Sequence, residues 1–225
     1  MQLPVLVDES MRQRFIEIGA LKVGGHFVYS GGGHCDEFFD FEAIVPRWPD
    51  IMFFYNNLCE GINDQRINTD VVIGPERGGI ALAHMTSYFL EKTANRPCRG
   101  IYAEKIRDVE ERRLIGCRYR IPAVFLNYLI DSTVLVLDDI ANTGGNIAEV
   151  VSLVRQAGAK QIIVAIMINR CCLTADQVSA DRLITVVEMP NKVWSAADCP
   201  MCKSHIPIDT EFGHGAEFLA SQAGK

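Results

Sequence analysis

An apolar run from residue 134 to residue 137 leads directly into two aspartates, a short turn and a Thr-Gly-Gly-Asn segment. Residues 134–146 read VLVLDDIANTGGN, and the following IAEVVSLVRQAG has the spacing of an amphipathic helix. A continuous run rich in β-branched residues is typical of a strand buried on both faces of a parallel sheet. The pattern therefore predicts a strand, a glycine turn and a helix, with the turn at the strand end where such sheets bind ligands.

The same alternation of strand and helix continues over most of the chain after Asp70. It predicts an α/β fold with a largely parallel sheet flanked by helices. Gly158 is expected to stop the second core helix. Expected strands cover residues 71–74, 99–103, 134–138, 161–168 and 183–188, with helices over 80–93 and 147–157.

An amino-terminal section precedes this core. Its pattern predicts helices over 8–19 and 50–61 and strands over 26–30 and 37–41. We expect three parts: residues 1–65 with these elements, a core over 66–190, and a tail over 191–225.

Composition and charge narrow the class of protein. The 225 residues suit one well-buried domain with a small appended element. A net charge of −6 without a long basic run argues against a nucleic-acid binder. We expect no membrane span, because no long uncharged apolar stretch occurs. The start lacks a secretory pattern and the eight cysteines are scattered, which favours a cytoplasmic protein with reduced thiols.

Two glycine turns are candidate anion sites. Gly144 and Gly145 let successive amides turn toward one anion, and the following helix adds its positive end. Asp138 and Asp139 suit two sugar hydroxyls or a hydrated Mg²⁺. A second turn, Glu76 to Gly79, follows the strand VVIG in the same way.

An acidic pair after a buried strand also occurs in other nucleotide-binding sites. A nucleotide triphosphatase needs an upstream glycine loop ending in Gly-Lys-Ser/Thr, and a dinucleotide site needs Gly-x-Gly-x-x-Gly; neither sequence is present. A purely structural turn stays open.

The segment VLVLDDIANTGGN resembles the phosphoribosyl-diphosphate signature of type I phosphoribosyltransferases. Asn142 and Asn146 depart from it, because the family more often carries Thr or Ser there. The resemblance implies that Asp138 and Asp139 serve the ribose and that the second turn contacts the diphosphate. The implied sugar-phosphate and diphosphate ligands are Asn142, Thr143, Gly144, Gly145, Asn146, Glu76, Arg77, Gly78 and Gly79.

The front segment GALKVGGHFVYSGGGHCDEFFDF is similar to orotate phosphoribosyltransferases. The resemblance implies that Phe38 and Phe39 wall the pyrimidine and that Arg170 binds the orotate carboxylate. Paired phenylalanines are also common in cores, and an arginine at a strand end is commonly a surface charge.

A charged, poorly periodic stretch covers residues 105–122. It lies where the resembled family has a mobile catalytic loop, which implies that Lys105, Arg107, Arg112 and Arg113 clamp the departing diphosphate. A solvated loop is the alternative.

The resemblance implies the type I phosphoribosyltransferase fold, with a parallel sheet and a small hood from the amino-terminal strands. It also implies a Mg²⁺-dependent transfer from 5-phosphoribosyl 1-diphosphate to orotate, carried out by a homodimer. Competing interpretations are transfer to another nucleobase, a non-catalytic sugar-binding regulator, and a zinc-stapled interaction protein.

The tail carries CPMC at residues 199–202. Cys199 and Cys202 have the spacing of half a Zn²⁺ site, with His205 nearby. The other half is not evident from the sequence, and His214 or a partner subunit could supply it.

Overall fold

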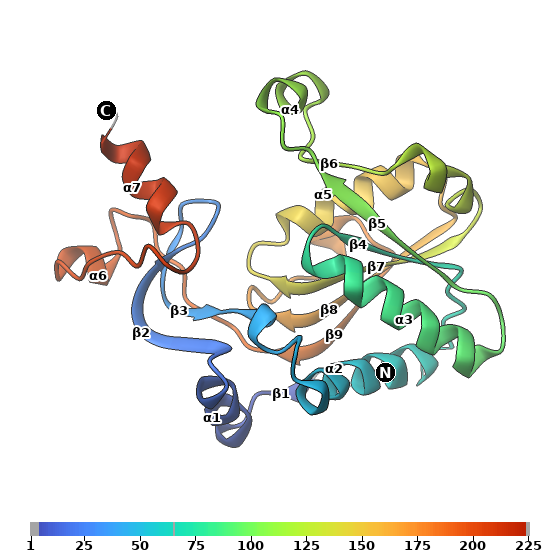
Figure 1. Cartoon of the computed structure of the whole chain (residues 1–225), viewed down its shortest axis with the longest axis horizontal. Helices are drawn as coiled ribbons and strands as arrows, with labels where there is room; N and C mark the ends of the chain where they lie inside the picture. Colours follow the sequence, from blue (N-terminus) through green and yellow to red (C-terminus); the bar gives the residue numbers. More distant parts are fainter. Residues whose placement is uncertain (1–4, 65, 224–225) are drawn as a thin grey trace. The chain divides into compact units, whose positions relative to one another are not determined.

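The computed structural model describes residues 5–64 and 66–223, and the chain divides into two compact units (Figure 1). The first unit comprises residues 51–189 together with the short strand β1 (Val5–Leu6). The second comprises residues 7–50 and 190–225, so it joins the amino-terminal section to the tail.

A seven-stranded sheet forms the centre of the first unit, counted over the described residues. Its strand order is β1-β9-β8-β7-β4-β5-β6, and every neighbouring pair is parallel except β5 with β6. The predicted parallel sheet is confirmed. The strands are β4 (Val71–Pro75), β5 (Arg99–Lys105), β6 (Tyr119–Arg120), β7 (Thr133–Ala141), β8 (Gln161–Asn169) and β9 (Arg182–Glu188).

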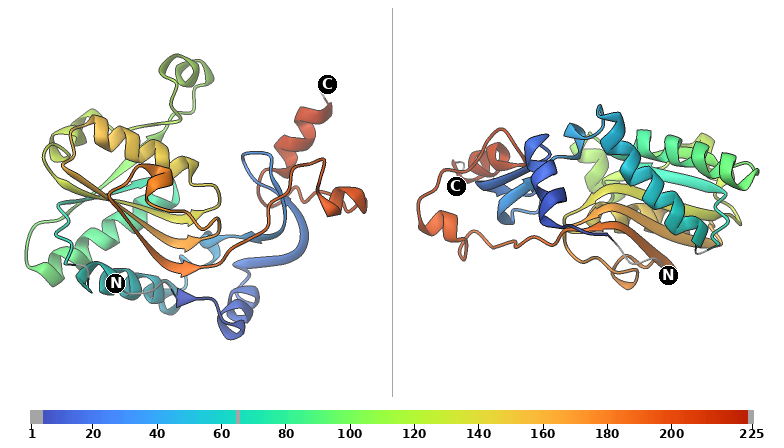
Figure 2. Two further views of the ribbon diagram at one scale, coloured as in Figure 1. Left: turned by 180° about the vertical axis from the view of Figure 1, so that it is seen from behind. Right: turned by 90° about the horizontal axis from the view of Figure 1, so that it is seen from below.

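Helices cover both faces of this sheet (Figure 2). Helices α2 (Trp48–Asp64) and α3 (Gly78–Ala94) lie over one face, and α5 (Gly145–Gln156) lies over the other. Val134 and Val136 of β7 share a buried apolar cluster with α5, while the alternate residues Leu135 and Leu137 are buried as well. Strand β7 is therefore covered on both sides, as its continuous apolar sequence predicts.

Two glycines bring strand β4 and helix α3 into backbone contact. A Cβ atom on Gly74 would lie 2.1 Å from the carbonyl oxygen of Gly79, and one on Gly79 would lie 2.8 Å from the backbone of Gly74. Only residues without a side chain allow this approach. The start of α3 is thereby held directly at the carboxyl end of β4.

The charged stretch after β5 folds into an arm that carries a short helix, α4 (Val109–Ile115). Asp108 accepts a hydrogen bond from the Glu111 amide, and Gly116, at φ 74°, ends the helix. None of the helix residues is buried. Apolar periodicity does not predict α4, because such periodicity arises only where one face of a helix is covered.

The second unit contains the antiparallel hairpin of β2 (Leu21–Val28) and β3 (His34–Phe39). Both strands begin earlier than the sequence pattern predicts, since β2 continues through Gly24 and Gly25 with an irregularity between Val23 and Phe27. The other helices of this unit are α1 (Glu9–Glu17), α6 (Pro200–Lys203) and α7 (Gly215–Ala223).

Short 3₁₀ helices complete the connections, at η1 (Phe41–Ala43), η2 (Ala123–Tyr128) and η3 (Asp176–Val178). No helix in residues 5–64 and 66–223 is both long and apolar enough to cross a membrane. The eight cysteines are all free thiols.

Candidate active site

The two adjacent aspartates lie near the carboxyl end of β7. Asp138 is buried, and its carboxylate accepts a 3.0 Å hydrogen bond from the Asp139 amide. The Ile140 amide donates to Asp139 over 2.7 Å. Burial, and then the neighbouring Asp139 carboxylate, raise the pKa of Asp138 well above its usual value. This pair of carboxylates is suited to a cation or to hydroxyl donors.

The glycine turn follows immediately and opens helix α5. Gly144 has φ 73°, a conformation that favours glycine, and a Cβ there would lie 2.5 Å from Leu173. The helix has no side-chain cap at this end, so its first amides are available to a ligand. Asn142 Oδ1 is buried and has no hydrogen-bond partner among the described residues.

The second glycine turn lies next to the acidic pair, because β4 and β7 are neighbouring parallel strands. A Cβ on Gly78 would lie only 2.5 Å from Asp139 Oδ2. The Glu76–Arg77 peptide is cis, and helix α3 begins at Gly78. The structure thus brings the turn 76–79 and the acidic pair together at the carboxyl ends of two central strands.

A cleft of about 550 Å³ opens where the arm leaves the sheet. Glu76 accepts a 2.9 Å hydrogen bond from the Lys105 amide and forms an ion pair with Arg107. These contacts lower the pKa of Glu76, with the Lys105 amide contributing most. The other lining residues are Ile80, Tyr102, Glu104, Ile106, Asp108, Glu111 and Arg120.

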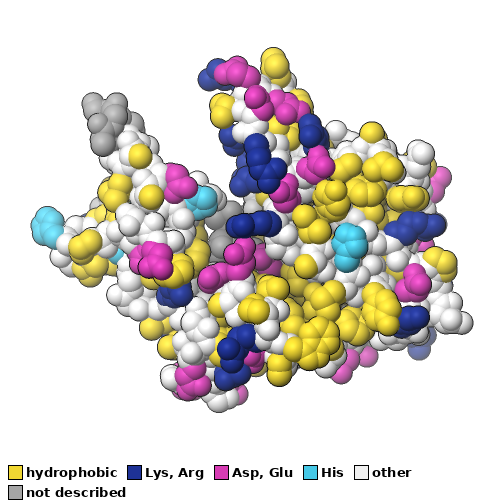
Figure 3. Space-filling model, viewed as in Figure 1, with side chains coloured by type: hydrophobic (Ala, Val, Ile, Leu, Met, Phe, Trp, Pro, Cys, Tyr) yellow, Lys and Arg dark blue, Asp and Glu magenta, His cyan; other side chains and the backbone are white. Residues whose placement is uncertain are grey.

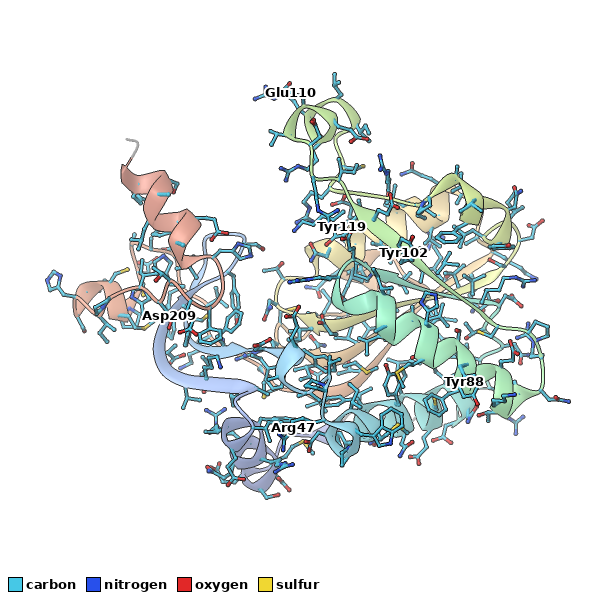
Figure 4. The ribbon with its side chains drawn as sticks, in the orientation of Figure 1. Arg47, Tyr88, Tyr102, Glu110, Tyr119 and Asp209 are labelled. Carbon is cyan, nitrogen blue, oxygen red and sulfur yellow. The ribbon has the colours of Figure 1, made fainter. Side chains whose placement is uncertain are left out.

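The remaining basic residues of the arm lie farther along it. Arg113 is exposed and pairs with Glu110 at the outer end of the arm, where Figure 4 labels Glu110. Arg112 is half-buried in the same helix. Figure 3 shows that basic and acidic side chains are mixed over this arm. Lys105 and Arg107 are therefore grouped with Glu76, whereas Arg112 and Arg113 belong to α4.

Arg170 and the two phenylalanines occupy different surroundings. Arg170, just after β8, is 2% exposed, and its amide donates to the Ala141 carbonyl over 2.9 Å. Arg170 is therefore not a surface charge.

The two phenylalanines lie in the second unit, where Phe39 is buried against Phe15 and the half-buried Phe38 faces Phe27, Tyr29 and Phe212. The role of both rings at a base stays a prediction.

Sequence reasoning missed three residues near the glycine turn that opens α5. Arg118 Nη2 would lie 3.4 Å from a Cβ on Gly145, and Glu149 of α5 holds this arginine with a 2.9 Å ion pair. The Tyr119 amide donates to the same glutamate over 2.7 Å. Burial and the Asp138 charge raise the pKa of Tyr119 to about 12. Figure 4 labels Tyr119 where the arm meets the sheet. Arg118 and Tyr119 belong to the sequence RYR and Glu149 to the predicted helix over 147–157, and neither context carries a recognisable signal.

Comparisons with known proteins agree with this geometry. Residues 45–199 match the family described as phosphoribosyl transferase domain. An orotate phosphoribosyltransferase of Caldanaerobacter subterraneus subsp. tengcongensis is 31% identical over 82% of this chain and 86% of its own length. The enzyme of the same description from Thermotoga maritima is 26% identical over 88% and 94%.

Solved structures share the fold. An orotate phosphoribosyltransferase from Aeropyrum pernix superposes with a TM-score of 0.58 at 20% identity, covering 79% of this chain and 92% of that one. An adenine phosphoribosyl transferase from Trypanosoma brucei gives 0.55 at 16%, covering 83% and 84%. The fold is therefore shared by enzymes named for different bases. The sequence relatives described above are more similar to this chain in sequence than these two solved structures are. The chain belongs to the phosphoribosyltransferase family, and the two sequence relatives described above are orotate phosphoribosyltransferases.

Proposed function

We propose that the protein transfers the phosphoribosyl group of 5-phosphoribosyl 1-diphosphate to orotate, forming orotidine 5′-monophosphate and diphosphate. The observation that carries this proposal is the acidic pair of β7, with the turn 142–145 after it and the turn 76–79 beside it. The relatives named orotate phosphoribosyltransferase supply the base.

The reaction needs positioning and charge stabilisation more than proton transfer. A ring nitrogen of orotate bonds to C1 of the ribose and loses its proton to water. The bond between C1 and the diphosphate oxygen breaks, and its electron pair leaves with the diphosphate. Positive charge develops on the ribose and negative charge on the leaving group.

The residues of the first unit suit these charges. Asp138 and Asp139 would hold the ribose hydroxyls and stabilise the positive sugar, which also restores the ionised form of Asp138. The amides of Thr143 to Asn146 would hold the 5′-phosphate, with Arg118 beside them. Lys105 and Arg107, next to the turn 76–79, would stabilise the departing diphosphate. Arg170 would pair with the orotate carboxylate.

Mg²⁺ fits the same strand ends. Burial and the neighbouring Asp139 carboxylate raise the pKa of Asp138, so a cation at this position would favour its ionised form, and carboxylate oxygens are the ligands that Mg²⁺ prefers. When bound, the ion would neutralise part of the diphosphate charge. Asp138 and Asp139 are the residues that would hold it through its hydration shell.

The proposal extends to a cytoplasmic homodimer. Eight free thiols support the compartment. Helix α4 has no buried residue and exposes Val109, Leu114 and Ile115, which supports an arm that contacts a second copy.

Orotate consumption tests the proposed function. Purified protein with Mg²⁺ and the diphosphate sugar should consume orotate, followed by the loss of its ultraviolet absorbance. Adenine, offered in a parallel reaction, should not be consumed. Binding of the sugar without turnover of either base would contradict the proposal and favour a regulator.

A further inference from the structure

Four metal-binding side chains of the second unit converge on one buried point. They are His26 of β2, His34 of β3, and Cys199 and Cys202 of the CPMC segment. Their nearest donor atoms all lie within 4.8 Å of one another. His26, His34 and Cys199 are buried, and Cys202 is partly buried. The half-site visible in the sequence is thus completed by two histidines about 170 positions earlier in the chain.

The spacing of these atoms suits a single tetrahedral ion. Cys199 Sγ lies 3.5 Å from His26 Nε2, and Cys202 Sγ lies 3.6 Å from His26 Nε2 and 3.5 Å from His34 Nδ1. Around a tetrahedral zinc with Zn–N of about 2.0–2.1 Å and Zn–S of about 2.3 Å, nitrogen and sulfur ligands are about 3.6 Å apart. The two imidazole nitrogens, now 2.7 Å apart, would separate by roughly 0.6 Å, a shift that rotation of the rings can provide.

Hydrogen bonds fix the orientation of His26. Its Nδ1 lies 2.7 Å from the Ile206 carbonyl oxygen, which can only accept, so Nδ1 carries the proton. The lone pair of His26 Nε2 is therefore directed at the other three metal-binding atoms, which are His34 Nδ1 and the two cysteine sulfurs. In protein zinc sites the second ring nitrogen of a ligating histidine usually donates to a carboxylate, a backbone carbonyl or water, and the Ile206 carbonyl is such a partner.

The two cysteines form a compact turn. The Cys202 amide donates to Cys199 Sγ over 3.5 Å, which stabilises negative charge on that sulfur. His34 Nε2 is buried with no hydrogen-bond partner among the described residues. A metal on Nδ1 gives this otherwise costly burial of the imidazole a compensating bond.

We propose that His26, His34, Cys199 and Cys202 form a structural Zn²⁺ site that joins the β2–β3 hairpin to the tail. Two thiolates and two neutral imidazoles leave the buried site without net charge, and four protein ligands leave no position open for substrate. Mixed sulfur and imidazole donors favour zinc over Mg²⁺. A two-iron cluster would hold its cysteine and histidine pairs on separate irons, which conflicts with donors this close together.

The site has a clear structural task. The tail pairs with the hairpin through backbone bonds from Trp194 to His34, Asp209 to His26 and His214 to Val28. The apolar cluster beside it is small, with Phe27, Tyr29 and Cys35 buried. A metal supplies stability where a small unit has little apolar core.

Metal analysis of the full chain tests the proposal. Protein made without a polyhistidine tag, in zinc-supplemented medium and under reducing conditions, should retain about one zinc per chain after dialysis. Cys202→Ser and His34→Gln should each lose most of it. Cys172→Ser, at an exposed free thiol, and His205→Gln, close to CPMC but outside the cluster, are matched controls that should keep it.

A second measurement does not depend on the variants folding. Wild-type apoprotein titrated with Co²⁺ should develop the visible bands of tetrahedral cobalt and a thiolate charge-transfer band, saturating at about one equivalent. Several results would each overturn the zinc proposal. In the wild-type protein these are octahedral cobalt, a zinc content well below one per chain, or a disulfide between Cys199 and Cys202 in the reduced preparation. Among the variants, the contradicting result is zinc lost from His205→Gln but kept in His34→Gln. These readouts are independent of orotate turnover.

Discussion

Asp138 combines a site position with an unfavourable electrostatic environment. Its carboxylate is buried beside Asp139, and both factors raise its pKa. Asp138→Asn should reduce the rate of orotate turnover by about 10²-fold or more, because the amide cannot stabilise positive charge on the ribose. Steady-state kinetics measure this. A rate within about twofold of wild type would mean that the acidic pair is not at the reacting centre.

The same substitution should stabilise the ligand-free fold at neutral pH. A raised pKa means that the folded state keeps a proton that the unfolded chain has released, so stability is full below the ordinary carboxyl pKa and declines as pH rises through the raised value. Asparagine stays neutral throughout. Urea unfolding at several pH values should show no difference at about pH 3.5 and a growing advantage for the variant toward pH 8. The opposite slope would contradict the raised pKa.

Gly144 is the second residue whose local geometry makes a sharp prediction. Gly144→Ala places a Cβ in a left-handed conformation and against Leu173, so it should cost at least about 1–2 kcal/mol of stability and weaken binding of the diphosphate sugar. Gly158→Ala is the control: its φ is 91°, but its nearest neighbour, Ile130 Cα, is 4.0 Å away and it lies at the far end of α5. Calorimetry should find sugar affinity reduced in Gly144→Ala alone; equal loss in both would point to general destabilisation.

At the scale of elements, the sequence pattern predicted those strands and helices that are covered by the core, because only burial imposes a regular apolar pattern. Strand β7 is covered on both faces, and the predicted strand over 134–138 lies within it. Helix α4 has no buried residue and therefore no periodic apolar signal. Strand β2 contains Gly24 and Gly25, which lower strand propensity, and its register is set by pairing with β3. His26 and His34 have no sequence relationship to CPMC, because only the fold brings them together.

The arm should act on catalysis rather than on the stability of the sheet. Lys105 is exposed at the base of the arm, and its amide, not its side chain, binds Glu76. Lys105→Ala should therefore leave thermal unfolding unchanged and lower kcat by about 10–100-fold, through loss of charge at the leaving group. Lys160→Ala, at an exposed lysine before β8, is the matched control and should retain full activity. Unchanged kcat in Lys105→Ala would favour a solvated loop.

At the scale of the whole molecule, the arm can act on the acidic pair of its own chain or on that of a second copy. Helix α4 exposes Leu114 and Ile115, and none of its residues is buried within its own chain. An element of this kind gains stability by contacting another surface. If the protein is a homodimer, the arm of one copy can complete the site of its partner.

Mixing two inactive variants distinguishes the arrangements. Asp138→Asn with Asp139→Asn removes the acidic pair, and Lys105→Ala with Arg107→Ala removes the arm cations. When equal amounts are unfolded and refolded together, half of the dimers contain one copy of each, and an arm acting across the interface leaves one intact site in each of them. Activity should then reach about a quarter of the wild-type value. If the arm acts within its own chain, the mixture contains no intact site and its activity stays at the mean of the two parent variants. That result would contradict an arm that acts across the dimer interface.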